Sequence, residues 1–349
     1  MSPLNGPQYD PTPIFEHFRG SYGTELLTAA VEHLGLFRVL AEGPLSAESL
    51  RTQLNLAPRA FVVLITAMRA MKLIDVDESH QLRLNPVARE HLVPGGAFYV
   101  GDYVGLAAGS PGVVEMANRL RTNHLARASE TDAGAAFIFR EGLESAMEQE
   151  QSARRLTLAL AGRARNVAPV LAEQLQFGRE TLLDVGGGTG IYAIACLRRH
   201  PQLTAIVFDR PEVLKVAREF AAEFGVSDRL QCHPGDMFAD PLPPADAILL
   251  SNVLHDWDVP ECRLLVNRCA AVLPERGRLL IHDVFLNDEL DGPLPVALYS
   301  ASLFSLTEGR AYSAREYREW LTEAGLVAGE IQPTLIHCGI LTGTKPALK

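Results

Sequence analysis

The chain has 349 residues, of which 47% are hydrophobic and 21% charged, enough apolar sequence for two or three domains with buried cores. Its formal net charge of -10 excludes a general affinity for nucleic-acid phosphates, because that affinity requires a basic face. The five cysteines are scattered without a Cys-x-x-Cys pair, so the sequence predicts neither a disulfide framework nor a zinc site and favours a reduced, cytoplasmic setting.

The amino-terminal part of the chain is predicted to be helical after a loose start. Residues 1–20 are rich in proline and glycine and predict an arm, without the basic and apolar regions of a secretory leader. Apolar residues then recur at helical spacing over residues 26–36. Ser46 begins a second helix, and Pro58 stands in the first turn of a third.

Two short apolar segments, residues 73–76 and 82–84, follow the third helix and predict a hairpin. Helices followed by a hairpin are typical of a winged helix-turn-helix. The third helix is apolar on nearly every face, whereas a helix that reads a DNA groove needs exposed polar side chains. Residues 1–95 are therefore predicted to form a winged-helix-like dimerisation domain, with a DNA-binding regulator as the alternative. Arg69 and Lys72 interrupt the same stretch, which excludes a membrane span.

The pattern changes towards the carboxyl terminus. Residues 96–170 predict helices that link the two halves and contribute to a substrate pocket, with a break at 109–112. From residue 171 onward, short apolar segments alternate with amphipathic helices, which predicts an α/β fold with a Rossmann-like, doubly wound, mostly parallel sheet over residues 171–349. The predicted strands are residues 181–185, 204–208, 230–233, 247–251 and 278–283.

A glycine-rich turn follows the first of these strands, in Leu-Leu-Asp-Val-Gly-Gly-Gly-Thr-Gly. Gly186 and Gly188 allow a sharp turn and let a ligand approach the main chain. A dinucleotide fingerprint would have the spacing Gly-x-Gly-x-x-Gly, but Ile191 stands where its last glycine would be. The carboxylate of Asp184 would repel a pyrophosphate and attract a cation, such as the amino group of a methionine moiety. The motif favours S-adenosylmethionine, and an NAD-dependent dehydrogenase remains an alternative.

Two more acidic residues follow the next strands. Asp209 ends the second strand, where a carboxylate can accept hydrogen bonds from ribose hydroxyls. Asp236 and Met237 follow the third strand, where they can bond the exocyclic amine of adenine and pack on its ring. Together with Asp184, these residues predict a single cofactor site.

His255 lies just beyond the fourth strand, where open α/β sheets bind their ligands. Methyl transfer from a sulfonium is a direct displacement, so the enzyme needs alignment and a base for the proton of the acceptor. A neutral imidazole can take that proton, and Asp283 is predicted to orient its ring; Asp256 is a weaker candidate, because neighbouring side chains point apart. A capping or core histidine is the alternative for His255. Asp256, Asp258 and Asp283 do not predict a metal site.

These segments together resemble the class I small-molecule O-methyltransferases of the plant caffeate and acetylserotonin type and their bacterial relatives, over most of the chain. The most specific piece is Leu254-His-Asp-Trp, which holds the catalytic base in this family. The resemblance implies S-adenosylmethionine as cofactor, His255 as base supported by Asp283, and a homodimer. The residues that it implies at the cofactor are Asp184, Gly186, Gly188, Asp209, Asp236, Met237, Ser251 and Trp257.

The sequence departs from the family pattern at two positions. Ala311 takes the place of a second supporting glutamate, which predicts a single supporting carboxylate and an acceptor more acidic than a simple phenol. Arg210 replaces an apolar residue after the ribose-binding aspartate and is predicted to stack on adenine. By resemblance Met147 borders the acceptor, and Tyr299 and Phe304 are predicted to line a flat, apolar pocket.

The function predicted from the sequence is methyl transfer from S-adenosylmethionine to a hydroxyl group of a small aromatic or polyketide-like molecule. Transfer to nitrogen or carbon, or a member of the fold that no longer methylates, is the nearest alternative. No metal, nucleic-acid or membrane partner is predicted.

Overall fold

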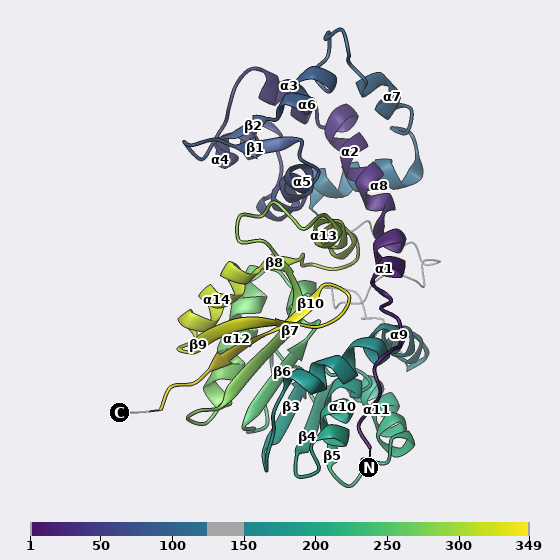
Figure 1. Ribbon diagram of the computed structural model, residues 1–349, viewed down its shortest axis with the longest axis vertical. Coiled ribbons are helices and arrows are strands. Elements are labelled where there is room, and N and C mark those ends of the chain that lie inside the picture. Colours follow the sequence, from purple (N-terminus) through teal and green to yellow (C-terminus); the bar gives the residue numbers. More distant parts are fainter. Residues whose placement is uncertain (1, 124–149, 348–349) are drawn as a thin grey trace. The chain divides into compact units, whose positions relative to one another are not determined.

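The computed structural model describes residues 2–123 and 150–347 (Figure 1). The chain forms two compact units. The sheet unit comprises Met1–Pro13, Glu130–Phe285 and Ala314–Lys349, and the helical unit comprises Ile14–Ser129 and Leu286–Ser313. None of the helices in the described ranges combines the length and the apolarity that a membrane crossing requires.

The sheet unit contains a mixed sheet with the strand order β5-β4-β3-β6-β7-β10-β9. Its strands are β3 (Thr181–Val185), β4 (Thr204–Asp209), β5 (Leu230–Pro234), β6 (Ala247–Ser251), β7 (Arg278–Leu286), β9 (Val327–Pro333) and β10 (Cys338–Thr344). The strands from β5 to β7 run parallel, and β10 is antiparallel to both of its neighbours. The five predicted strands and the doubly wound fold are confirmed, because continuous apolar strands such as β3 and β6 are buried as parallel central strands should be.

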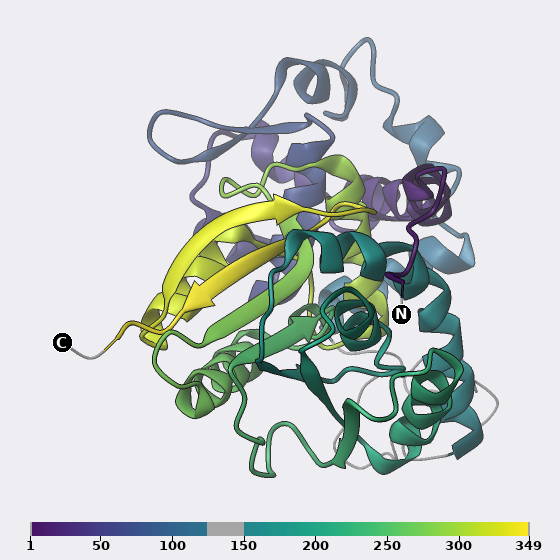
Figure 2. The ribbon, with the colours of Figure 1, turned by 60° about the horizontal axis from the view of Figure 1, so that its bottom comes forward.

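Helices cover both faces of this sheet (Figures 1 and 2). They are α9 (Glu150–Gln174), α10 (Ile191–Arg199), α11 (Pro211–Glu223), α12 (Val259–Val272) and α14 (Ala314–Glu323). Helices α10 and α11 pack against α9, and α12 packs against α14. The strand order reverses at β3, since β4 and β5 lie on one side of it and β6 and β7 on the other. Open α/β sheets bind their ligands beyond the carboxyl ends of the strands at such a point.

The helical unit is built around one apolar cluster. Its helices are α1 (Thr12–Arg19), α2 (Ser21–Thr28), the π-turn η1 (Ala29–His33), α3 (Leu36–Ala41), α4 (Ala47–Gln53), α5 (Pro58–Ala70), α6 (Pro86–His91), α7 (Gly101–Gly105), α8 (Pro111–Thr122) and α13 (Leu294–Leu306). Its strands are β1 (Ile74–Val76), β2 (Leu82–Leu84) and the short β8 (Tyr312–Ser313).

The predicted helices and hairpin of the amino-terminal part are confirmed. Ser46 caps α4 by accepting a hydrogen bond from the amide of Ser49. Helix α5 is buried along almost its whole length and packs against α13, as its all-round apolar sequence requires. The prediction of a loose arm is wrong for the residues of α1. Prolines fit the first turn of a helix, and the carboxylate of Asp10 accepts a hydrogen bond from the amide of Thr12 where α1 begins.

Candidate active site

The loops that follow β3, β4, β5 and β6 meet at one edge of the sheet, because the carboxyl ends of parallel strands lie together. The turn after β3 requires glycine. Gly186 and Gly188 have φ of 67° and 59°, a left-handed conformation that other residues rarely adopt. A Cβ on Gly187 would lie 2.7 Å from Cγ of Asp184, whereas a Cβ on Gly188 would meet nothing within 4 Å. The turn is thus packed against Asp184 at Gly187 and open at Gly188, which suits a ligand that lies against the main chain.

The carboxylate of Asp184 lies beneath this turn and is fully buried. Within the described residues, neither of its oxygens makes a hydrogen bond of normal geometry. Burial, followed by the nearby charge of Asp209, raises its pKa to about 7, against a smaller lowering by the backbone amide of Ala193. A buried carboxylate that receives no hydrogen bond of normal geometry is costly, so the site fits a ligand that brings a cationic donor. The amino group of S-adenosylmethionine is such a donor.

Asp209 ties the end of β4 to the glycine turn. Its carboxylate accepts hydrogen bonds from the amide of Gly188 at 2.8 Å and from the amide of Arg210 at 2.7 Å. Burial raises the pKa of Asp209, although both amides act in the opposite direction. The carboxylate therefore fixes the shape of the turn, and its predicted contact with ribose would use the remaining acceptor capacity.

The side chain of Arg210 has a partner that the sequence did not reveal. It donates a 3.0 Å hydrogen bond to Asp236, and the other carboxylate oxygen of Asp236 accepts from the amide of Phe238 at 2.8 Å. The carbonyl group of Met237 accepts from Arg268 on α12 at 2.9 Å. The loop after β5 is thus held from both sides, with Arg210 and Asp236 only partly buried.

Trp257 lies at the same rim of the site. Its ring packs edge-on against Phe238, with 4.6 Å between the ring centroids. The predicted adenine-binding residues Asp236, Met237 and Trp257 therefore belong to one connected group. Their contact with adenine remains a prediction.

A polar network that the sequence analysis missed surrounds Ser251, at the end of β6. The hydroxyl of Ser251 lies 2.8 Å from Nδ1 of His282 and accepts from the amide nitrogen of Asn252 at 3.1 Å. Arg163 of α9 donates to the amide oxygen of Asn252 at 2.6 Å, which fixes the orientation of that amide. Burial, then the charge of Arg163, lowers the pKa of His282 to about 3, so His282 stays neutral.

His255 and Asp283 form a buried pair at the next strand ends. His255 lies in the short 3-10 helix η2 (Leu254–Asp256), and Asp283 lies on β7. The Nδ1 atom of His255 is 2.5 Å from Oδ1 of Asp283, which also accepts from the amide of Val284 at 2.8 Å. The hydroxyl of Tyr317 donates to Oδ2 of Asp283 at 3.1 Å. With Nδ1 donating to the carboxylate, Nε2 is the atom of the neutral ring that can accept a proton.

Two carboxylates and burial have opposite effects on the pKa of His255. Burial lowers the pKa of His255, but Asp283 and Asp256 raise it by more, so the net shift is upward. The Nε2 atom lies 3.6 Å from Oδ1 of Asp256, a contact that adjacency in sequence did not favour. Burial raises the pKa of Asp256 to about 6, against the opposing effect of His255. Among the described residues, no group of histidine, cysteine and acidic side chains could hold a metal ion.

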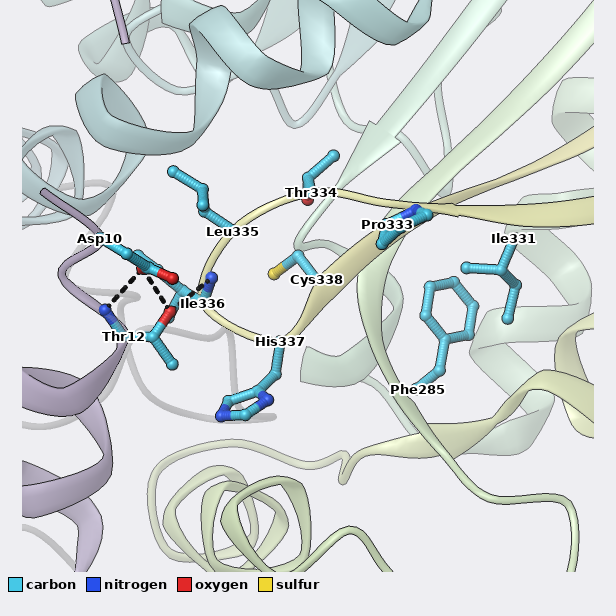
Figure 3. Close-up of a pocket in the computed structure, with 11 residues that line it drawn as sticks. Asp10, Thr12, Phe285, Ile331, Pro333, Thr334, Leu335, Ile336, His337 and Cys338 are labelled. Atoms are coloured by element: carbon cyan, nitrogen blue, oxygen red, sulfur yellow. Dashed lines mark hydrogen bonds between the residues drawn. The ribbon is translucent and has the colours of Figure 1, made fainter. Parts of the chain in front are cut away.

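A cavity of about 380 Å³ lies in the sheet unit beside the turn between β9 and β10 (Figure 3). Asp10 and Thr12 stand on one side of it, and Phe285 and Ile331 stand on the other. Phe285 follows Asp283 by two residues on β7, so both side chains lie on the same face of the strand.

The predicted acceptor-pocket residues lie on α13 or outside the described residues. Phe304 is buried in the apolar cluster of the helical unit, with the guanidinium of Arg59 4.7 Å from its ring centre. Tyr299 is half-buried, with the guanidinium of Arg19 3.6 Å from its ring centre. Met147 lies outside the described residues. A role for all three in binding the acceptor stays a prediction.

Comparison with known proteins agrees with this geometry. Residues 133–327 match the family model of the O-methyltransferase domain, which is more than half of the chain. The chain is 35% identical over 318 residues to the 3-hydroxy-5-methyl-1-naphthoate 3-O-methyltransferase of Streptomyces sahachiroi, which covers 90% of this chain and 89% of that protein. It is 31% identical over 307 residues to the N,N-dimethyltransferase OxyT of Streptomyces rimosus, which covers 86% of each.

A solved structure is similar over almost the whole chain. It is the O-methyltransferase family 2 protein of Planctomyces limnophilus in complex with apigenin, which has 48% sequence identity and a TM-score of 0.89 and covers 99% of both chains. This protein therefore belongs to the O-methyltransferase family and is an S-adenosylmethionine-dependent methyltransferase.

Proposed function

We propose that the protein transfers a methyl group to a hydroxyl of a small aromatic or polyketide-like molecule, with His255 as the general base. The observation that carries this proposal is the 2.5 Å contact between Nδ1 of His255 and Asp283 at the carboxyl edge of the sheet. This contact leaves Nε2 as the proton acceptor. His255 lies in η2, shortly after β6 ends at Ser251.

The residues at the glycine turn are proposed to hold S-adenosylmethionine. When bound, this donor supplies an electrophilic methyl group on a sulfonium. Asp184 would bind its amino group, because that carboxylate is buried and, among the described residues, receives no hydrogen bond of normal geometry. The main chain of Gly186 and Gly188 would lie against it, and Asp209 would accept from its ribose. The residues proposed to border the adenosine end are Arg210, Asp236, Met237, Ser251 and Trp257.

The proton of the acceptor hydroxyl is proposed to pass to Nε2 of His255 as the oxygen attacks. Asp283 then stabilises the imidazolium and keeps the ring in one orientation. His255 acts as a base only when it is neutral, and its pKa is raised above the usual 6.5. Methyl transfer should therefore decline as the pH falls through this raised pKa.

The acceptor is proposed to be a phenol or enol more acidic than a simple phenol. Asp283 bonds the imidazole directly, and Asp256 lies 3.6 Å from Nε2. An imidazole ordinarily holds a proton less strongly than a phenolate does, so this base suits an acceptor that ionises easily. The two O-methylating relatives named above are associated with a hydroxynaphthoate and with apigenin, both aromatic hydroxyl compounds. Transfer to an amine is the second candidate, since the similar OxyT is an N,N-dimethyltransferase.

The helical unit is proposed to form a homodimer interface. Several large apolar side chains of this unit are exposed, among them Phe98 at 64%, Tyr103 at 78% and Leu106 at 82%. Large apolar side chains that gather on a surface commonly bind another protein. The five cysteines are all free, which supports a reducing, cytoplasmic location. A dimer that survives at nanomolar concentration in analytical ultracentrifugation would agree with this proposal, and a monomer at micromolar concentration would contradict it.

The decisive experiment is a screen of phenolic compounds with isotopically labelled S-adenosylmethionine, followed by mass spectrometry of the product. Label on an aryl oxygen would agree with the proposal, and label found only on nitrogen would favour the second candidate. Calorimetry with the donor and with NAD tests the site separately. Saturable binding of the donor without binding of NAD is expected, and the reverse result would overturn the cofactor assignment.

A further inference from the structure

Tyr317 is a buried tyrosine whose hydroxyl reaches the supporting carboxylate. It lies on α14, and both Tyr317 and Asp283 are at most 1% exposed. The hydroxyl donates to Oδ2 of Asp283 at 3.1 Å, while Oδ1 accepts from His255 and from the amide of Val284. Both oxygens of the carboxylate are thus engaged by donors, and the donor on the side away from His255 is a neutral hydroxyl.

We infer that Tyr317 is a positioning residue, which acts through Asp283 to limit how strongly His255 holds a proton. The inference rests on the proposed role of His255 as the base. A carboxylate that accepts hydrogen bonds at both oxygens attracts an imidazolium less strongly than one with a bare oxygen. A hydroxyl also adds no charge, whereas a carboxylate in its place would stabilise the imidazolium further, as Asp256 already does from the side of Nε2. Tyr317 thus supports Asp283 while keeping His255 able to release its proton.

The packing around Tyr317 holds the hydroxyl in place. Its ring lies edge-on to Phe285, with 5.4 Å between centroids, and edge-on to Trp320, with 5.3 Å between centroids. A phenol ring held on two sides loses little further freedom when its hydroxyl bonds, so the hydrogen bond to Asp283 is preorganised. Tyr317 and Trp320 are both buried on α14 and three residues apart, as side chains on one helix face should be.

The test is to titrate His255 in the Tyr317→Phe variant, which removes the hydroxyl and keeps the ring. NMR of full-length protein labelled at its histidine rings reports the pKa directly, and a His255→Gln variant assigns the signal. We expect the pKa of His255 to rise by about half a unit to one unit, a 3- to 10-fold change in its protonation equilibrium. With apigenin as the acceptor probe, the acid limb of kcat/KM should move upward by the same amount, and the alkaline plateau should change by less than about twofold.

Two controls separate this role from simple packing. Trp320→Phe loosens the packing around Tyr317 but keeps the hydroxyl, so it should lower Tm and leave the pKa of His255 unchanged. In an Asp283→Asn background, Tyr317→Phe should no longer affect His255. A loss of Tm without a shift of His255, or an equal shift in the Asp283→Asn background, would overturn the inference. The NMR titration needs no acceptor, so a protein that fails to methylate but shows the shift would refute the proposed function alone.

Discussion

The active-site edge has a donor end, at Asp184 and the glycine turn, and a base end, at His255 and Asp283. The two ends differ in how many hydrogen bonds the chain itself provides to their buried carboxylates. At the donor end, Asp184 is fully buried, and among the described residues only the backbone amide of Ala193 acts on its charge as a donor, without a hydrogen bond of normal geometry. At the base end, Asp283 is equally buried but accepts hydrogen bonds from His255, Val284 and Tyr317. In the proposed site the donor end is therefore completed by a ligand, whereas the base end is preorganised by the chain's own hydrogen bonds.

This difference has an energetic meaning. An uncompensated buried carboxylate reduces the stability of the free protein, and that cost is recovered when a cation binds. A carboxylate with all its donors in place contributes to stability and keeps its charge. Burial raises the pKa of Asp283, but His255 and the other donors lower it by more, so the net shift is downward. Substitutions at the two ends should consequently have different effects on binding, turnover and stability.

Replacing His255 with Ala should have the largest effect. Loss of the base should lower kcat about 100- to 10,000-fold, while the Kd for S-adenosylmethionine should change by less than about twofold. Single-turnover transfer of labelled methyl and calorimetric binding measure the two quantities. Near-normal turnover in this variant would mean that the base end has been misassigned.

Replacing Asp184 with Asn should separate binding from stability. The Kd for S-adenosylmethionine should rise about 10- to 100-fold, because a charged hydrogen bond is lost. The ligand-free protein should gain thermal stability at pH 8, because the pKa of Asp184 rises from 3.8 to about 7 in the fold and its ionised form is therefore disfavoured. Thermal unfolding with and without the donor tests both effects, and a destabilised ligand-free variant would contradict the comparison.

The same carboxyl predicts a pH dependence of donor binding in the unmodified protein. Asp184 must ionise to attract the amino group, so affinity should increase as the pH rises from about 6 to 8 and then level off. Calorimetry in buffers of different ionisation enthalpy would detect the proton released near neutral pH. Binding without proton release would show that another group meets the cation.

Replacing Asp256 with Asn should change the base end moderately. Removing this charge beside Nε2 lowers the raised pKa of His255, so the acid limb of kcat/KM should move down by about half a unit to one unit. At pH values below the acid limb, the variant should therefore have a kcat/KM about 3- to 10-fold higher than that of the unmodified enzyme. A limb that stays in place would mean that Asp256 does not act on His255.

Replacing Arg210 with Ala should have the smallest effect. Its pair with Asp236 is partly exposed, and pairs of this kind contribute about 0–1 kcal/mol. The Kd for the donor should rise by no more than about threefold. A much larger loss that Arg210→Lys does not restore would support the alternative in which the guanidinium stacks on adenine.

At both ends the sequence predicted the residues that local signals mark, including the pair of His255 and Asp283. Glycine spacing and an acidic strand end are local signals, so the sequence located Asp184, Gly186 and Gly188 at one turn. The five strands of the parallel sheet were equally visible, because buried strands are continuously apolar.

The contacts that the sequence could not reveal join residues far apart in the chain. Tyr317 is 34 residues from Asp283, and Arg210 is 26 residues from Asp236. No periodicity or spacing connects such residues, because the packing of α14 and of the loop after β5 decides which groups meet. The early helix α1 was missed for a different reason, since its flanking prolines are typical of loops as well as of helix starts.

The boundaries of the helical unit place a constraint on protein engineering. The chain leaves the sheet unit after Phe285 and returns at Ala314, so the hydrogen bond between Asp283 and Tyr317 spans that excursion. A fragment that lacks the amino-terminal half would therefore still contain Leu286–Ser313 of the helical unit, including the apolar helix α13, without the rest of that unit's core. Exchanging the helical unit between relatives should accordingly move both of its segments at once.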